Sequence, residues 1–366
     1  MPRADPRIRK VLTTVNGQVA DRAIRHALFL ERFKTHEVDQ IIRFLNSEVF
    51  PDIANIVRVR LEMGRVLTWT AYRHQEMLKA VDQEIRTGMR YARNRLSKEL
   101  KAFAISEAEF QAAVMDGYTP KVFGIDFVVP PPAKLHALVT SKPFEGKLLR
   151  EWFDGLVPQH KAKLGRAIKV GMAQGEPIPK IMRRIRGSKA AGFKDGIFEI
   201  SRRNCEAIVR TATAHVASAA RMATYEANKD VVAGWKFLAT LDAMTTDICM
   251  SLDGNEYVIG EGGADRPPLH FQCRSTTTPI LKSWKELGID LKEAPPGTRA
   301  TMDGQVPANL TYGEWLKGQP DWVQNSALGK GKAEIFRRGD LSIKQFVDNR
   351  NQPLTLKQLI ELEKAQ

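Results

Sequence analysis

The sequence lacks a long apolar run. No stretch of its 366 residues approaches the roughly 18 apolar residues that a membrane-spanning helix requires, so we do not expect a membrane protein. The first residues, MPRADPRIRKVLTT, are basic and contain no apolar core, which argues against a secretory signal. Cysteine is also scarce, and three cysteines cannot build a disulfide framework. These absences favour a protein of the reducing cytoplasm.

Proline and glycine are scarce in the first third of the chain. From residue 21 to residue 101 the only proline is Pro51, and apolar residues recur at helical spacing. This pattern predicts a helical N-terminal region over residues 1–118, whose narrow apolar stripe is typical of extended helices that pack on a neighbour. Prolines then cluster in the next fifteen residues, which favours an extended arm over a core helix. We therefore expect a linker over residues 119–146.

The sequence pattern of the second half changes from helical to strand-like after residue 230. Residues 147–230 predict helices again, the last of them rich in alanine. Alternating residues of β propensity follow, and the expected short strands are 234–241, 257–259 and 276–281. They belong to a small module at 231–285, and short helices separated by glycine and proline extend over 286–366. The predicted fold class is α+β and predominantly helical, with a long helical N-terminal part and a smaller mixed C-terminal module containing a short antiparallel sheet.

Positive charge is in excess, and it is unevenly spread. The net charge is +14. Residues 1–234 carry 40 Lys and Arg against 25 Asp and Glu, a balance of +15, whereas residues 235–366 carry 16 against 17. A one-sided excess indicates a polyanionic neighbour, of which nucleic acid is the first candidate. Solvated helix surfaces and protein-docking faces remain the alternatives.

Two groups of arginines are the candidates for contact with nucleic acid or a partner protein. They are Arg86, Arg90 and Arg93, which share one face of a predicted helix, and Arg183, Arg184 and Arg186, which lie at the end of a short one.

Two of the three cysteines lie near a histidine. Cys249 precedes a Pro-Pro-x-His-x-x-Cys-Arg run that contains His270 and Cys273. These side chains supply three ligands of the tetrahedral set that structural zinc prefers, and Asp242 is a candidate for the fourth. The alternatives are two buried thiols beside a hydrogen-bonded histidine, or a disulfide in an oxidising place. We expect no cofactor other than such a structural zinc.

The same residues allow a catalytic interpretation. Asp242, His270 and Cys273 around a metal would make a nuclease site, and a Cys/His pair is the raw material of a thiol nucleophile. No supporting motif accompanies them: the sequence has no Walker loop, no HExxH and no GxSxG. We therefore expect no enzyme and no catalytic residue.

An ordered set of residues resembles the phage Mu F-like head-morphogenesis family, the minor capsid proteins of tailed bacteriophages. The set begins with Arg210-Thr211, an alanine-rich helix, Arg221, Tyr225 and Trp235, and continues with Asp242, Thr246, Cys249, Asp253-Gly254, Pro267-Pro268, His270 and Cys273-Arg274. The tail is similar as well, with Tyr312, Trp315, Leu316, Gln319, Leu328-Gly329 and Gly339 in the expected order. The resemblance covers about residues 145–360. One departure is Ser275, where many members of the family have a further cysteine.

The resemblance implies a structural protein of the virion. Such a protein lies in the capsid interior near the portal, after assembly in the host cytoplasm, and assists procapsid assembly and DNA packaging or delivery. The implied partners are the portal protein, the major capsid or scaffolding protein and packaged double-stranded DNA, with the helical region 1–118 as a docking part. A metal-dependent nuclease, or another nucleic-acid-binding phage protein, is the alternative.

Overall fold

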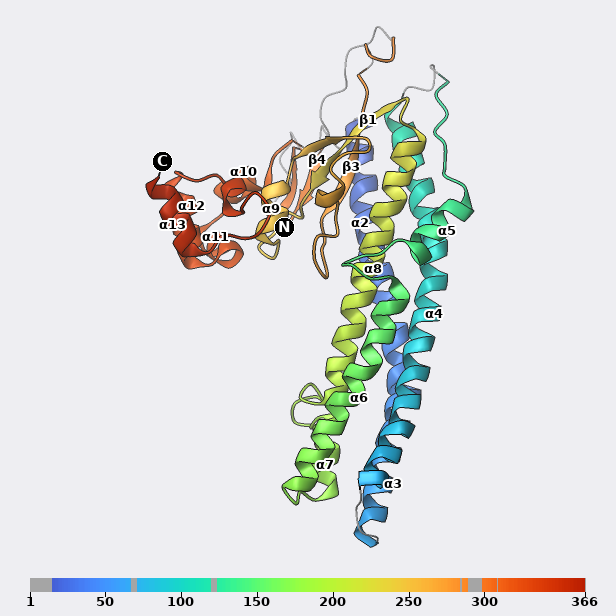
Figure 1. Cartoon of the computed structure of the whole chain (residues 1–366). Helices are drawn as coiled ribbons and strands as arrows, with labels where there is room; N and C mark the ends of the chain where they lie inside the picture. Colours follow the sequence, from blue (N-terminus) through green and yellow to red (C-terminus); the bar gives the residue numbers. More distant parts are fainter. Residues whose placement is uncertain are drawn as a thin grey trace, which may run out of the picture. The chain divides into compact units, whose positions relative to one another are not determined.

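The computed structural model describes residues 15–66, 71–119, 124–283, 285–288, 298–307 and 309–365. Helices dominate, and a short antiparallel sheet lies in the C-terminal part (Figure 1), so the predicted fold class is confirmed. The chain divides into two compact units, and each is built from segments far apart in sequence. The first unit comprises Met1–Leu30, Ala104–Leu135 and Ala214–Gln366; the second comprises Glu31–Phe103 and His136–Thr213.

Long helices form the N-terminal region. Helix α2 (Val15–Phe44) passes through a π-helical turn, η1 (Leu45–Val49), into α3 (Phe50–Val66), and α4 (Ala71–Tyr118) follows with 48 residues. Later in the chain come α5 (Pro132–Ser141), α6 (Leu149–Ala173), α7 (Ile178–Arg186) and α8 (Ile197–Ala227). The unit boundaries fall inside α2, α4, α5 and α8, so each of these helices contributes to both units.

In the second unit, aromatic rings stack between helices, and one glycine lets two helical segments approach closely. Phe44 stacks on Tyr91 with ring centroids 3.7 Å apart, and Phe50 stacks on Phe198 at 4.1 Å. Gly88 on α4 faces the π-helical turn, where an added Cβ would lie only 3.0 Å from a methyl carbon of Val49. The small residue therefore allows α4 to pack directly against η1.

A buried carboxylate joins the helical segments of the first unit. Glu107 on α4 is fully buried, and its oxygens lie 2.5 Å from Arg221 Nε of α8 and 2.5 Å from His26 Nε2 of α2. Gln111 donates a further hydrogen bond to it at 2.8 Å and accepts one from the Tyr225 hydroxyl. One acidic side chain thus connects α2, α4 and α8.

The sheet of the first unit has three strands in the order β2-β1-β3. The central β1 (Val232–Leu238) pairs antiparallel with β2 (Glu256–Val258) and with β3 (Thr276–Leu281). The three strands predicted from the sequence are therefore present, with shifts of one to three residues at the ends of the first two. A separate hairpin of β4 (Thr298–Thr301) and β5 (Gly304–Pro307) follows.

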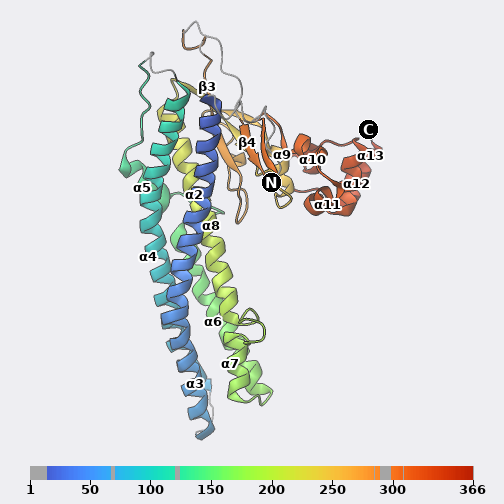
Figure 2. The ribbon, with the colours of Figure 1, turned by 180° about the vertical axis from the view of Figure 1, so that it is seen from behind.

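Short helices complete the C-terminal part, as Figure 2 shows from behind. They are α9 (Asp247–Leu252) and η3 (Gly263–Asp265) within the strand module, and α10 (Tyr312–Lys317), α11 (Asp321–Leu328), α12 (Lys330–Arg338), η4 (Ile343–Phe346) and α13 (Leu356–Lys364) after it. Tyr312 and Trp315 are buried in one core with Trp235 of β1. Gly329 and Gly339 have φ of 75° and 87°, backbone conformations that favour glycine, at the ends of α11 and α12.

The predicted linker, residues 119–146, is not extended throughout. The described residues 124–131 form no helix or strand, but α5 follows them with Leu135 and Val139 buried. The extended part is also fixed, because the Asn228 side chain accepts a hydrogen bond from Val128 N at 2.7 Å and donates one to Val128 O at 2.9 Å. The run of prolines marks the start of α5, a position that proline tolerates, and does not prevent the helix.

We expect Glu107→Gln to lower the free energy of unfolding by about 3–5 kcal/mol at neutral pH, because it leaves the Arg221 charge buried and unpaired. Burial alone would raise the pKa of Glu107, but the Arg221 charge and the hydrogen bond to His26 outweigh it and lower the pKa to about 2. The stabilisation is therefore complete above about pH 4.5 and disappears as the pH falls towards 2.

Denaturant unfolding between pH 7 and pH 2 measures this difference. The gap between parent and variant should close as the pH falls through that window. Glu109→Gln is the matched control, because Glu109 is exposed two residues along the same helix. A gap independent of pH would contradict the proposed role of Glu107.

Candidate functional site

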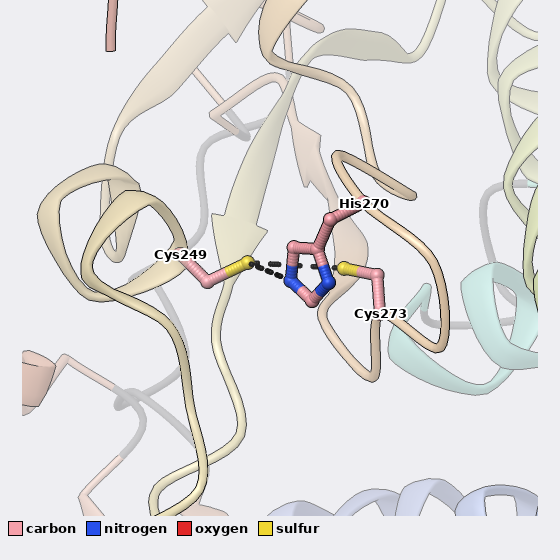
Figure 3. A group of neighbouring side chains, drawn as sticks. All are labelled: Cys249, His270 and Cys273. Carbon is pink, nitrogen blue, oxygen red and sulfur yellow. Dashed lines mark hydrogen bonds between the residues drawn. The ribbon is translucent and has the colours of Figure 1, made fainter. Parts of the chain in front are cut away.

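Cys249, His270 and Cys273 converge in the first unit, and we call them the Cys/His cluster (Figure 3). Cys249 lies on α9, whereas His270 and Cys273 lie on the loop that leads into β3. Their potential ligand atoms all lie within 4.8 Å of one another. The two sulfurs are 3.8 Å apart, and Cys249 Sγ is 3.4 Å from His270 Nε2. All three cysteines are reduced, and both cysteines of the cluster are buried.

A tight turn brings His270 and Cys273 to the same side of the loop. The backbone N–H of Cys273 donates to the carbonyl of His270 at 3.2 Å, and Gln272 between them has a φ of 60°. A left-handed residue at the third position is what type II turns require. The Pro267–Pro268 peptide before the turn is cis. The three-residue spacing of His and Cys is thus the spacing of a turn.

Hydrogen bonding orients the imidazole of His270. Its Nδ1 lies 2.9 Å from the carbonyl oxygen of Phe271, which can only accept, so Nδ1 carries the proton. The Nε2 lone pair then faces Cys249 Sγ and the hydroxyl of Thr246, which is 3.1 Å away. The ring therefore presents its unprotonated nitrogen to Cys249 Sγ.

The two thiols of the cluster have different acidities. The hydrogen bond from Cys249 lowers the pKa of Cys273 against the effect of burial. The same contact raises the pKa of Cys249, and burial adds to the rise. Their contact therefore favours the ionised form of Cys273 over that of Cys249.

Asp242 is not one of the residues that converge in the Cys/His cluster. Arg274 holds its carboxylate with two hydrogen bonds, of 2.5 and 2.8 Å. Oδ1 also accepts hydrogen bonds from Met244 N and the Thr245 hydroxyl. Among the described residues the structure thus brings together three of the four predicted metal ligands, and it gives the Asp242 carboxylate to Arg274.

The structural role of Asp253 was not predicted from the sequence. Its buried carboxylate accepts hydrogen bonds from Ala239 N at 2.7 Å and Tyr312 N at 2.6 Å, and it forms a two-bonded ion pair with Arg299. These donors come from the end of β1, from α10 and from β4. An Asp-Gly pair after a short helix predicts only a turn, so no local signal reveals this role.

The first predicted arginine group is partly neutralised. Arg86 pairs with Asp82 at 2.6 Å and Arg93 with Asp154 at 3.5 Å, both on the second unit. Arg90 is exposed and makes no ion pair with any residue that the structure describes.

The second arginine group lies on α7 and is more open. Arg184 is paired with Glu176, and the hydrogen bonds from Arg184 and Lys180 lower the pKa of that carboxyl to about 2. Arg183 and Arg186 are exposed, and within the described ranges neither has an acidic partner.

The net charge of the protein belongs to one unit. The second unit contains 30 Lys and Arg against 17 Asp and Glu, a balance of +13, whereas the first contains 26 against 25, a balance of +1. The division between residues 1–234 and 235–366 had located this excess only coarsely. The unpaired arginines of α7 lie on the charged unit.

Three comparisons relate the chain to known proteins. No curated protein and no solved structure matches it. The family model described as "Phage Mu protein F like protein" matches residues 162–278, which run from α6 to the start of β3 and include the Cys/His cluster and the arginines of α7. Residues 145–161 and 279–360, which also carry the resemblance, lie outside the match. None of the described helices combines the length and the apolar character needed to cross a membrane.

This relationship indicates a bacteriophage protein of head morphogenesis, and with it a place in the virion or in assembly within the host cytoplasm. The resemblance seen in the sequence is thereby confirmed: over residues 162–278 the chain matches the phage Mu protein F-like family.

Proposed function

We propose that the protein is a structural minor head protein, placed inside the capsid near the portal, that assists procapsid assembly and DNA packaging or delivery. The match over residues 162–278 is the observation that carries this proposal, because it relates the chain to phage heads. The charge distribution supports it: a unit with a balance of +13 suits a place beside DNA, and a nearly neutral first unit suits contact with capsid or portal protein.

The location of the protein tests this function. We expect it in purified procapsids and virions at a copy number well below that of the major capsid protein, by quantitative mass spectrometry. A phage that lacks the gene should yield fewer infectious, DNA-filled heads, and the protein supplied in trans should restore them. Absence from both particles would contradict the proposal.

The DNA contact is proposed to lie on the second unit, around α7. Exposed cations there without an ion pair among the described residues are Arg166, Lys169, Arg183, Arg186, Lys189 and Lys194. The nearby acidic groups are already engaged, since Glu176 binds Arg184 and Asp195 accepts hydrogen bonds from Ser188. These cations are therefore available to phosphate groups.

We expect the triple variant Arg183→Ala, Arg186→Ala, Lys189→Ala to bind double-stranded DNA more weakly, whatever its sequence. Each phosphate that the variant no longer neutralises should reduce the slope of log affinity against log salt by about 0.9. Fluorescence anisotropy at several salt concentrations measures the slope. The control removes the same charge from the nearly neutral unit: Lys330→Ala, Arg350→Ala, Lys357→Ala. An equal effect of the two triple variants would refute this surface.

The rival function is a metal-dependent nuclease that uses Asp242, His270 and Cys273. The contacts favour a structural cluster, because Arg274 occupies both oxygens of Asp242 and the cysteines are buried. We propose that the protein is not an enzyme.

Incubation with plasmid DNA and Mg²⁺, Mn²⁺ or Zn²⁺ decides between the two. We expect no cleavage above that of a folded His270→Ala control, measured by gel electrophoresis. Cleavage that the parent shows and the control lacks would establish the nuclease instead.

A further inference from the structure

We infer that the Cys/His cluster binds one zinc ion through Cys249 Sγ, Cys273 Sγ and His270 Nε2. The separations of Cys249 Sγ from the other two ligand atoms are those of zinc ligands, and all three atoms lie within 4.8 Å of one another. Two thiolates about 2.3 Å from a tetrahedral zinc lie about 3.8 Å apart, and a thiolate and an imidazole nitrogen lie about 3.5 Å apart. The observed distances are 3.8 Å between the sulfurs and 3.4 Å between Cys249 Sγ and His270 Nε2.

The hydrogen bonding of His270 is the kind expected of a metal ligand. Zinc-binding histidines commonly donate their second ring N–H to a carbonyl or carboxylate, which fixes the ring and its tautomer. His270 has this arrangement, because Nδ1 donates to the Phe271 carbonyl while Nε2 faces Cys249 Sγ (Figure 3). A histidine that served only as a packing residue would not need its lone pair directed at a thiol.

The donor set selects the class of metal. Two sulfurs and one imidazole nitrogen suit zinc and similar thiophilic ions, whereas Mg²⁺ and Ca²⁺ prefer oxygen ligands. With the Asp242 carboxylate held by Arg274, the chain supplies three ligands, and a solvent molecule completes the tetrahedron. The hydroxyls of Thr246 and Ser275 lie near Cys249, where they oppose the rise in its pKa.

The ion would act as a cross-link within the first unit. Cys249 belongs to α9, and the other two ligands belong to the loop before β3, 21 and 24 residues further along. Binding displaces the thiol protons and ties these segments together only in the folded state, so part of the binding free energy stabilises the fold. This inference does not depend on the proposed function.

Metal analysis of the full chain tests the site. The protein is purified under reducing conditions, exposed to Zn²⁺ alone and freed of excess ion. We expect about one zinc per chain by elemental mass spectrometry, as a single set of ligands implies. Cys249→Ser, Cys273→Ser and His270→Gln should each lose most of it. Cys205→Ala is the matched control, because Cys205 is a buried free thiol on α8 outside the cluster and its removal should leave the zinc content unchanged.

Two measurements remain informative if a ligand variant fails to fold. Replacement by Co²⁺ in the parent chain should give the visible absorption bands of a tetrahedral ion and a thiolate charge-transfer band. Removal of zinc by a chelator should lower the melting temperature of the parent and of Cys205→Ala, and added Zn²⁺ should restore it.

A gain-of-function variant tests the open fourth position. Ser275→Cys places a third sulfur beside Cys249 and should slow the loss of zinc to a chelator by about tenfold or more, as an added ligand converts an open site into a closed one. Ser251→Cys is the control, because the Ser251 hydroxyl is bonded to Ile248 O within α9.

Three results would overturn the inference. One is a parent chain that binds no more zinc than Cys273→Ser while both remain folded. Another is a Co²⁺ spectrum without tetrahedral bands. The third is a Cys249–Cys273 disulfide, detected by mass spectrometry in protein isolated without reductant.

Discussion

The C-terminal part of the protein depends on the buried carboxylate of Asp253. The three strands of the sheet are too short to enclose a core, so other elements must be held against them. Asp253 satisfies backbone donors at Ala239 and Tyr312 and pairs with Arg299, which links the end of β1 to α10 and β4. A buried charge is tolerable only when it is paired and hydrogen bonded, so these partners and the carboxylate require one another.

Among the helices of the first unit, Glu107 has the same role as Asp253. It gathers Arg221 and His26 from two other helices around one carboxylate, and the long amphipathic segments thereby acquire a fixed register. Apolar packing between helices allows several registers. A buried ion pair whose members are also hydrogen bonded allows only the register that keeps its partners together. In both places a single acidic side chain determines which distant segments meet.

The two candidate functional features of the protein, the Cys/His cluster and the exposed cations, lie on different units. The cluster lies in the nearly neutral unit and its contacts are those of a cross-link, with buried sulfurs and an oriented imidazole. The cations lie on the other unit, exposed and only partly paired. The cluster and the exposed cations around α7 fall within residues 162–278, the segment that matches the phage Mu protein F-like family.

The sequence by itself determined the features that depend on neighbouring residues. Helical periodicity, the alternation at β1 and the β propensity of β3 are local, so the fold class and the three strands could be predicted. The triad Cys249, His270 and Cys273 was also visible, because its spacing is that of a turn and an approaching helix. Composition revealed the positive charge.

Only the tertiary structure decided which partners these groups meet. Asp242 was a plausible fourth ligand until Arg274 was found on both of its oxygens, and nothing near Asp253 in the sequence indicated that three segments converge on it. The charge excess acquired a location when segments far apart in sequence combined into one unit. The physical reason is the same in each case: long-range ion pairs and hydrogen bonds depend on the path of the chain in space, and a local pattern of residues carries no record of that path.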